Sequence, residues 1–147
     1  MVDQVQRLYN TDFWLWIQQT AQQLQDREFD DVDWENLIEE LEALGRNDKR
    51  AVVSNARIVI LHLLKWAYEP QRRSRSWLSS IGEHRNRLAE LFEESPSLQR
   101  IYTEEFEKAY QRARKQAVLE TGLDIKSFPE RSPFTSDEVL SLDFLPQ

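Results

Sequence analysis

Apolar residues recur at intervals of three and four along most of this chain, and residues that interrupt helices are scarce. Three glycines and five prolines occur among its 147 residues. No segment alternates strictly between apolar and polar residues, which is the pattern of a half-buried strand. The helix-favouring residues Leu, Glu, Gln, Arg and Ala dominate instead. The sequence therefore predicts an all-α fold, a bundle of about five helices.

The predicted helices are separated by short segments that carry capping or helix-ending residues. They cover approximately residues 12–24, 33–44, 47–69, 74–91 and 95–122. Thr11 or Asp12 is expected to begin the first helix and Ser74 to cap the fourth, and the fifth is expected to end at Gly122. Gly45 is expected to end the second helix, and Pro70 to end the third, because proline lacks the amide hydrogen of a helical residue. Further along, Thr135 and Glu138 form a capping-box pattern. We therefore expect an ordered C-terminal tail that carries a short helix.

The apolar residues of the first two predicted helices fall on one face of each helix. In the first helix this face holds Phe13, Trp14, Ile17, Ala21 and Leu24, and Trp16 lies off it. In the second helix it holds Trp34, Leu37, Ile38, Leu41 and Leu44. The third helix is apolar on nearly all sides, so we expect it to be the central one.

Length and composition suit one folded domain over residues 1–147. Hydrophobic residues make up 40% of the chain and charged residues 31%, so both a core and a hydrated surface can form. Cysteine is absent, which excludes disulfides, thiolate zinc sites and cysteine nucleophiles. No secretory signal is visible, and no window reaches the roughly 18 apolar residues that cross a bilayer. We therefore expect a cytoplasmic protein without a membrane partner.

The charged residues are divided between two adjacent segments of opposite sign. The net charge of −7 argues against a general nucleic-acid binder, which is normally basic. Residues 26–48 contain ten acidic and two basic residues, and residues 49–87 contain nine basic and two acidic ones, which gives −8 and +7. Because opposite charges on neighbouring elements attract, the sequence favours mutual neutralisation of these two segments within the folded chain.

The stretch HLLKWAYEPQRRSRSW, residues 62–77, gathers many of these basic residues at an expected helix corner. Guanidinium groups bind phosphate or carboxylate groups in a bidentate manner, and a Trp side chain can stack on a ligand. The candidate site for an anion or a protein partner comprises His62, Lys65, Arg72, Arg73, Arg75 and Trp77. The alternative is structural: these side chains close the corner against an acidic counter-surface of Glu35, Glu39, Glu40 and Glu42.

Established catalytic and metal-binding patterns are missing from the sequence. The chain has no glycine-rich phosphate loop, no nucleophile elbow, and neither the Glu-x-x-His nor the His-Glu-x-x-His spacing of bundle and zinc sites. We therefore expect no metal and no cofactor. His84 is expected to be partly buried and hydrogen-bonded to a neighbour, whereas His62 and Lys65 could in principle form a general acid and base. Whether the protein is an enzyme stays open.

Several segments together resemble the bacterial family known as domain of unknown function twenty-nine, which is frequent in cyanobacteria. They are YNTDFWLWIQQTAQQL (9–24), FDDVDWENLIEELEALGRNDKRAV (29–52), HLLKWAYEPQRRSRSW (62–77), SPSL (95–98) and the C-terminal pieces ETGL, FPERSPF and FLP. The resemblance spans nearly the entire chain. It implies an all-helical domain, and it implies no assigned reaction, substrate or cofactor.

These observations favour a protein that binds another protein, or a second copy of itself, and has no catalytic activity. Five Trp residues are many for so small a core, and Trp and Arg are frequent anchors of interfaces. Two alternatives stay open. One is an enzyme or phosphate-binding protein that uses residues 62–75, and the other is a nucleic-acid-binding protein or a toxin–antitoxin component.

Overall fold

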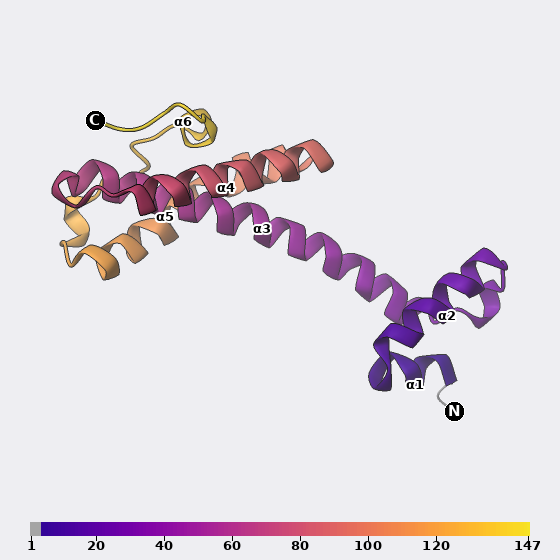
Figure 1. The fold of residues 1–147 in the computed structure, drawn as a ribbon. Coiled ribbons are helices and arrows are strands. Elements are labelled where there is room, and N and C mark those ends of the chain that lie inside the picture. The colour runs from indigo at the N-terminus through magenta and orange to yellow at the C-terminus, as the bar shows by residue number, and fades with distance from the viewer. Residues whose placement is uncertain (1–3) are drawn as a thin grey trace. The chain divides into compact units, whose positions relative to one another are not determined.

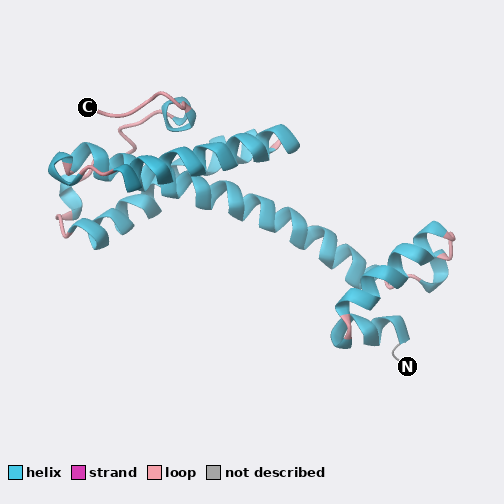
Figure 2. Ribbon diagram, viewed as in Figure 1, coloured by secondary structure: helices cyan, strands magenta, loops and turns pink. Residues whose placement is uncertain are grey.

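The computed structural model describes residues 4–147, with side chains from residue 7 onward. Within these residues the chain forms α-helices and no strand, which confirms the predicted all-α fold (Figures 1 and 2). The helices are α1 (Gln4–Thr11), α2 (Phe13–Gln25), α3 (Trp34–Tyr68), α4 (Arg75–Glu94), α5 (Leu98–Thr121) and α6 (Ser136–Leu140). Short 3-10 turns cover Phe29–Asp31, Pro70–Arg72 and Ile125–Ser127.

The chain divides into two compact units, which we call the N-terminal unit (Met1–Arg46) and the C-terminal unit (Asn47–Gln147). Helix α3 begins in the first unit and ends in the second. Each unit is described by itself below. The expectation that residues 1–147 form a single domain stays a prediction.

Three local features shape the N-terminal unit. The carboxylate of Asp12 accepts a hydrogen bond from the backbone N–H of Leu15 and caps α2, as the sequence predicts. Asp33 caps α3 in the same way by accepting from the backbone N–H of Asn36. Between them, Arg27 has a φ of 58°, in the left-handed region that commonly ends a helix. These features turn the chain from α2 into α3.

The structure differs from the sequence-based expectations at α1 and at two residues of α2. The predicted helices begin at about residue 12, whereas the structure forms α1 before that residue. The expectation that Trp14 lies on the apolar face of α2 and Trp16 off it is wrong, because Trp16, three residues after Phe13, is 2% exposed, whereas Trp14 is 70% exposed. Trp16 is buried because its ring packs against that of Tyr9 in α1, with 5.0 Å between the ring centroids.

Gly45 does not end a helix, contrary to the sequence-based prediction. Helix α3 runs without a break from Trp34 to Tyr68, so the second and third predicted helices are one. A single glycine costs a helix interior about 1 kcal/mol, and the residues after Gly45 all tolerate helical geometry. Helix α3 ends just before Pro70, where the sequence predicts a helix end.

The C-terminal unit holds an extensive core around the second part of α3. Figure 1 shows α4 and α5 lying along this part of the helix. The buried residues of α3 are Val52, Val53, Ala56, Val59, Ile60, Leu61, Leu63 and Leu64. They lie on nearly all sides of the helix, as expected for a central one. Ser74 caps α4 and Gly122, with a φ of 75°, ends α5, both as predicted.

The C-terminal tail is ordered and packs on this core, as predicted. Thr135 and Glu138 form the expected capping box at the start of α6. Phe128, Phe134 and Val139 are buried. Arg85 of α4, 3% exposed, donates hydrogen bonds to the backbone carbonyls of Val139 at 2.8 Å and Glu138 at 3.2 Å. A buried guanidinium group therefore holds α6 against the core.

Candidate functional site

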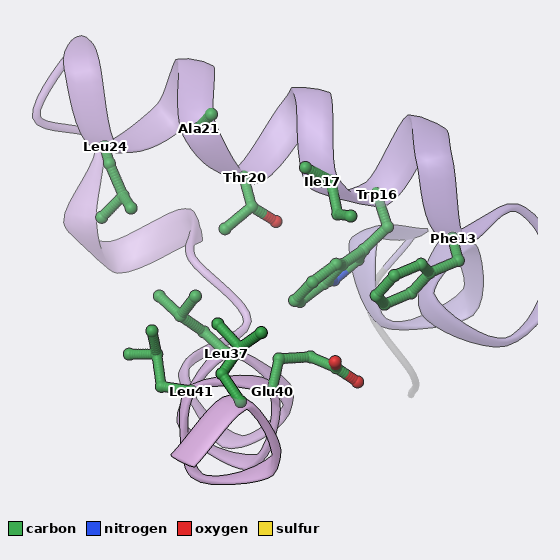
Figure 3. A pocket seen from close by; sticks show the side chains of 10 residues that line it. Phe13, Trp16, Ile17, Thr20, Ala21, Leu24, Leu37, Glu40 and Leu41 are labelled. Atoms are coloured by element: carbon green, nitrogen blue, oxygen red, sulfur yellow. The ribbon is translucent and has the colours of Figure 1, made fainter. Parts of the chain in front are cut away.

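An open apolar groove lies within the N-terminal unit, between α2 and the first part of α3 (Figure 3). Its volume is about 350 Å³. The residues that line it are Phe13, Trp16, Ile17, Thr20, Ala21 and Leu24 from α2, and Leu37, Glu40, Leu41 and Leu44 from α3. Spacings of three and four residues place these side chains on one face of each helix. The groove is therefore the space between two amphipathic faces.

Aromatic rings form one end of the groove. The rings of Phe13 and Trp16 are stacked, with centroids 5.6 Å apart and an interplanar angle of 16°. Tyr9 of α1 meets both rings edge to face. Such contacts stabilise a cluster beyond the area that it buries. The three rings therefore give this end of the groove a defined shape.

Glu40 supplies the charged group of the groove. The hydroxyl of Tyr9 donates a hydrogen bond to Oε1 of Glu40. This bond raises the pKa of the Tyr9 hydroxyl, with smaller contributions from burial and from the charges of Glu40, Glu39 and Asp33. Figure 3 shows the Glu40 carboxylate beneath the ring of Phe13. A negative charge thus lies at the aromatic end of an otherwise apolar groove.

Many apolar side chains around the groove are exposed. On α3, Leu41 is 59% exposed and Leu44 62%, and Ile38 on the same helix is 51% exposed. On α2, Phe13 is 44% exposed and Ile17 41%. Clusters of exposed apolar residues mark binding surfaces in soluble proteins. The two helices present a shared apolar surface to solvent.

Helix α2 also carries polar atoms that are buried without a hydrogen-bond partner. They are Nε1 of Trp16, Oγ1 of Thr20 and Oε1 of Gln23. Leaving such an atom unpaired costs about 1–3 kcal/mol, so most buried polar atoms in proteins are paired. Three unpaired atoms on one helix of 13 residues indicate that the packing around α2 is incomplete.

Part of the basic candidate site predicted from the sequence comes together in the C-terminal unit. The ammonium group of Lys65 lies 4.7 Å from the centroid of the Trp77 ring and 3.0 Å from Oε1 of Glu120. Burial raises the pKa of Glu120, but the hydrogen bonds from Lys65 and Gln116 and the nearby positive charges together lower it more, so the net pKa is below its usual value. Lys65 is therefore engaged in an ion pair and a cation–π contact.

The arginines of that candidate site make separate, local contacts. Arg73 donates from Nε to the backbone carbonyl of Trp66 at 2.9 Å and lies 4.7 Å from the centroid of its ring. Nε of Arg72 lies 3.9 Å from the carboxylate of Glu69. Arg75 is exposed at the first residue of α4. A shared binding role for these side chains stays a prediction.

Four ion pairs that involve the basic segment are defined within the C-terminal unit. Lys49 pairs with Glu105, Lys65 with Glu120, Arg72 with Glu69 and Arg87 with Glu83. All four carboxylates lie outside residues 26–48. Of the acidic counter-surface, Glu39 pairs with Arg46 at 2.7 Å, and Glu35 and Glu42 are exposed. Four basic residues thus pair with carboxylates on α4, α5 and the turn after α3, and neutralisation by residues 26–48 stays a prediction.

The two histidines lie on α3 and α4 of the C-terminal unit. Nδ1 of His62 donates to the backbone carbonyl of Ile58 at 2.9 Å. Nδ1 of His84 donates to Oδ1 of Asn55 at 2.7 Å, which confirms the expected bond to a neighbour. Burial is the main cause that lowers the pKa of both imidazoles.

In the part of the chain that the structure describes, no three His, Asp or Glu side chains gather as a metal site requires.

Sequence reasoning finds the residues of the groove but not their exposure. Helical periodicity shows that the stripe from Trp34 to Leu44 shares one face, but it does not show what covers that face. The signal that could separate a core face from a binding face is charge. The N-terminal 46 residues hold eleven acidic and three basic residues around these apolar faces, which gives −8.

Comparisons with known proteins place the chain in a family, but they assign it no reaction and no ligand. No helix among residues 4–147 combines the length and apolar character needed to cross a membrane. The chain has no significant match among curated proteins or among solved structures. Residues 8–145 match the family described as domain of unknown function DUF29. Since this match covers nearly the whole sequence, from α1 to the C-terminal tail, the chain belongs to that family.

Proposed function

We propose that this protein is a protein–protein interaction module and that the groove between α2 and α3 is its binding surface. The observation that carries the proposal is the exposure of apolar side chains on both walls, with Leu41 at 59% and Leu44 at 62%. Complete burial of one leucine side chain contributes about 1.5–3 kcal/mol. A partner that covers several of these side chains therefore gains substantial binding free energy.

A protein suits this surface better than a small molecule does. The groove volume of about 350 Å³ lies near the lower end of the range for ligand pockets. Ile38 and Trp14 are exposed although they do not line the groove. A protein partner covers such neighbouring side chains together with the groove, and a small molecule does not. Aromatic residues such as Phe13 and Trp16 are also frequent anchors of protein interfaces.

The unpaired polar atoms of α2 support the same proposal. Trp16 and Thr20 are 2% and 3% exposed, yet the indole nitrogen and the hydroxyl lack hydrogen-bond partners. In the C-terminal unit, by contrast, the buried Arg85 and Tyr102 both bond to backbone carbonyls. A docked partner that changes the packing around α2 would allow these atoms to form hydrogen bonds. The N-terminal unit is therefore the part of the chain suited to docking.

The test compares two leucine variants of the full chain. Leu41→Asp places a charge in the groove, and Leu119→Asp makes the same change at a residue of α5 that is 84% exposed. Surface changes of this kind alter stability by about 0.5 kcal/mol or less, so both variants should keep their helicity and melting temperature. We expect a specific partner to be recovered by the wild type and by Leu119→Asp, and lost with Leu41→Asp.

The measurement is affinity capture followed by identification and renewed binding of the purified partner. Circular dichroism of both variants serves as the folding control. Recovery of the same proteins in equal amounts by all three chains would show that the groove is not the binding surface.

A further inference from the structure

We infer that the groove between α2 and α3 receives a basic amphipathic helix of a partner protein. This inference rests on the proposed function, because it names the class of partner for the same surface. It depends on the shape of the groove and on its negative charge. The same charge also disfavours other kinds of occupant.

The shape of the groove suits a helix. Its walls are two helices whose lining side chains are spaced by three and four residues, from Phe13 to Leu24 on α2 and from Leu37 to Leu44 on α3. Rows with this spacing accept the ridges of a third helix. Helix α2 has 13 residues and spans roughly 20 Å at 1.5 Å per residue, so about four turns of a partner helix match its length.

The charge of the N-terminal unit selects a basic partner. Residues 1–46 contain eleven acidic and three basic residues, a net charge of −8. Among the described residues of this unit, Glu39 and Arg46 form the only ion pair, and the net charge of −8 already counts both. Surfaces of opposite sign attract partners over long distances and favour correct pairing. A helix with Lys or Arg beside its apolar face complements this surface.

Glu40 is the contact point for one of those basic side chains. Its carboxylate lines the groove, and Tyr9 donates to Oε1. In the described part of the chain, no hydrogen bond reaches its Oε2. An ammonium or guanidinium group at the edge of the partner helix can therefore bind this oxygen without displacing Tyr9.

The same charge disfavours the other occupants of an apolar groove. A second copy of the chain, docked through the same surface, brings two units of −8 together, and like charges at an interface oppose association. The cytoplasmic leaflet of a membrane is anionic and repels this unit. Nucleic acids are polyanions and are repelled in the same way.

The experiment measures binding of two designed peptides to the full-length protein. Both are 18-residue helices with leucine at positions i, i+3, i+4 and i+7, and they differ in having Lys or Glu on the other face. Fluorescence anisotropy of a labelled peptide gives the dissociation constant. At about 50 mM salt we expect the Lys peptide to bind at least about tenfold more tightly than the Glu peptide, with a smaller difference at higher salt.

Matched variants locate the site. Glu40→Gln keeps an acceptor for Tyr9 and removes one charge, and Glu35→Gln makes the same charge change at an exposed residue that does not line the groove. We expect Glu40→Gln to raise the dissociation constant of the Lys peptide by about fivefold, and Glu35→Gln to raise it by less than about twofold. Leu41→Asp should abolish binding, although it adds a negative charge that attracts the peptide.

The possible results separate the inference from the proposed function. Stronger binding of the Lys peptide to Leu41→Asp would reveal nonspecific charge attraction and overturn the inference. Equal binding of both peptides, lost in Leu41→Asp, would overturn the basic partner and leave the groove as a binding surface. A dimer of the free protein that Leu41→Asp dissociates in sedimentation would identify a second copy as the occupant and overturn the inference. Absence of peptide binding, with protein capture independent of Leu41, would overturn the proposed function as well.

Discussion

At the scale of single residues, His62 links protonation to stability. Its imidazole is half-buried, and burial lowers its pKa below the ordinary value of 6.5 more than the Ile58 carbonyl raises it. The charge of Lys65 lowers the pKa further and that of Glu120 raises it. His84, on the facing helix, has its pKa lowered mainly by burial and also by Arg87. Protonation of either imidazole is therefore less favourable in the folded state than in the unfolded state.

The sign of the resulting pH dependence follows from the lowered pKa values. Just below pH 6.5 the unfolded chain binds more protons than the folded one, so the free energy of unfolding falls as the pH drops. This decrease in the free energy of unfolding is complete once the pH is well below the pKa of the folded state. We expect His62→Gln to reduce this slope in urea unfolding measured between neutral pH and about pH 5. An unchanged slope in the variant would contradict the assignment to His62.

At the scale of helices, Gly45 weakens the middle of α3. An added Cβ meets no atom within 4 Å there, and the backbone is helical. We expect Gly45→Ala to raise the free energy of unfolding by about 0.5–1 kcal/mol, because alanine loses less backbone entropy in a helix. Chemical denaturation measures the change.

Gly122 provides the control, since a Cβ added there also meets no atom within 4 Å, but the residue has a φ of 75°. Gly122→Ala should lower stability by about 1 kcal/mol, because alanine is strained in the left-handed region. Equal effects of the two substitutions would show that backbone conformation does not decide the outcome.

The helices show what sequence can predict and what it cannot. Local chemistry correctly predicts the ends set by Ser74, Pro70 and Gly122, because caps and helix-ending residues act within one turn. It fails at Gly45, where a cost of about 1 kcal/mol is too small to end a helix. It also fails for Trp16, whose burial depends on the ring of Tyr9 in another helix. The groove escapes sequence reasoning for the same reason, since exposure of Leu41 depends on what packs against it.

At the scale of the whole molecule, Arg85 joins the C-terminal tail to the core of the C-terminal unit. Arg85→Met should lower the free energy of unfolding by about 2–4 kcal/mol, because two backbone carbonyls lose charged hydrogen-bond donors. Limited proteolysis should also cleave the tail faster. Arg87→Met is the control: Arg87 is exposed and pairs with Glu83 on the surface, so the change should be below about 1 kcal/mol. Similar losses in both variants would contradict this role of Arg85.

Besides its buried apolar side chains, the tail is held by hydrogen bonds from α4 and α5 to its main chain. Arg85, Tyr102, Tyr110 and Arg114 bond to carbonyl oxygens of Glu138, Val139, Ser136, Pro129, Phe128 and Ile125. A carbonyl oxygen is present whatever side chain a residue carries. Apart from the capping box of Thr135 and Glu138, outward-facing residues between 129 and 138 can therefore diverge during evolution, or be replaced by design, while these hydrogen bonds to the helices remain.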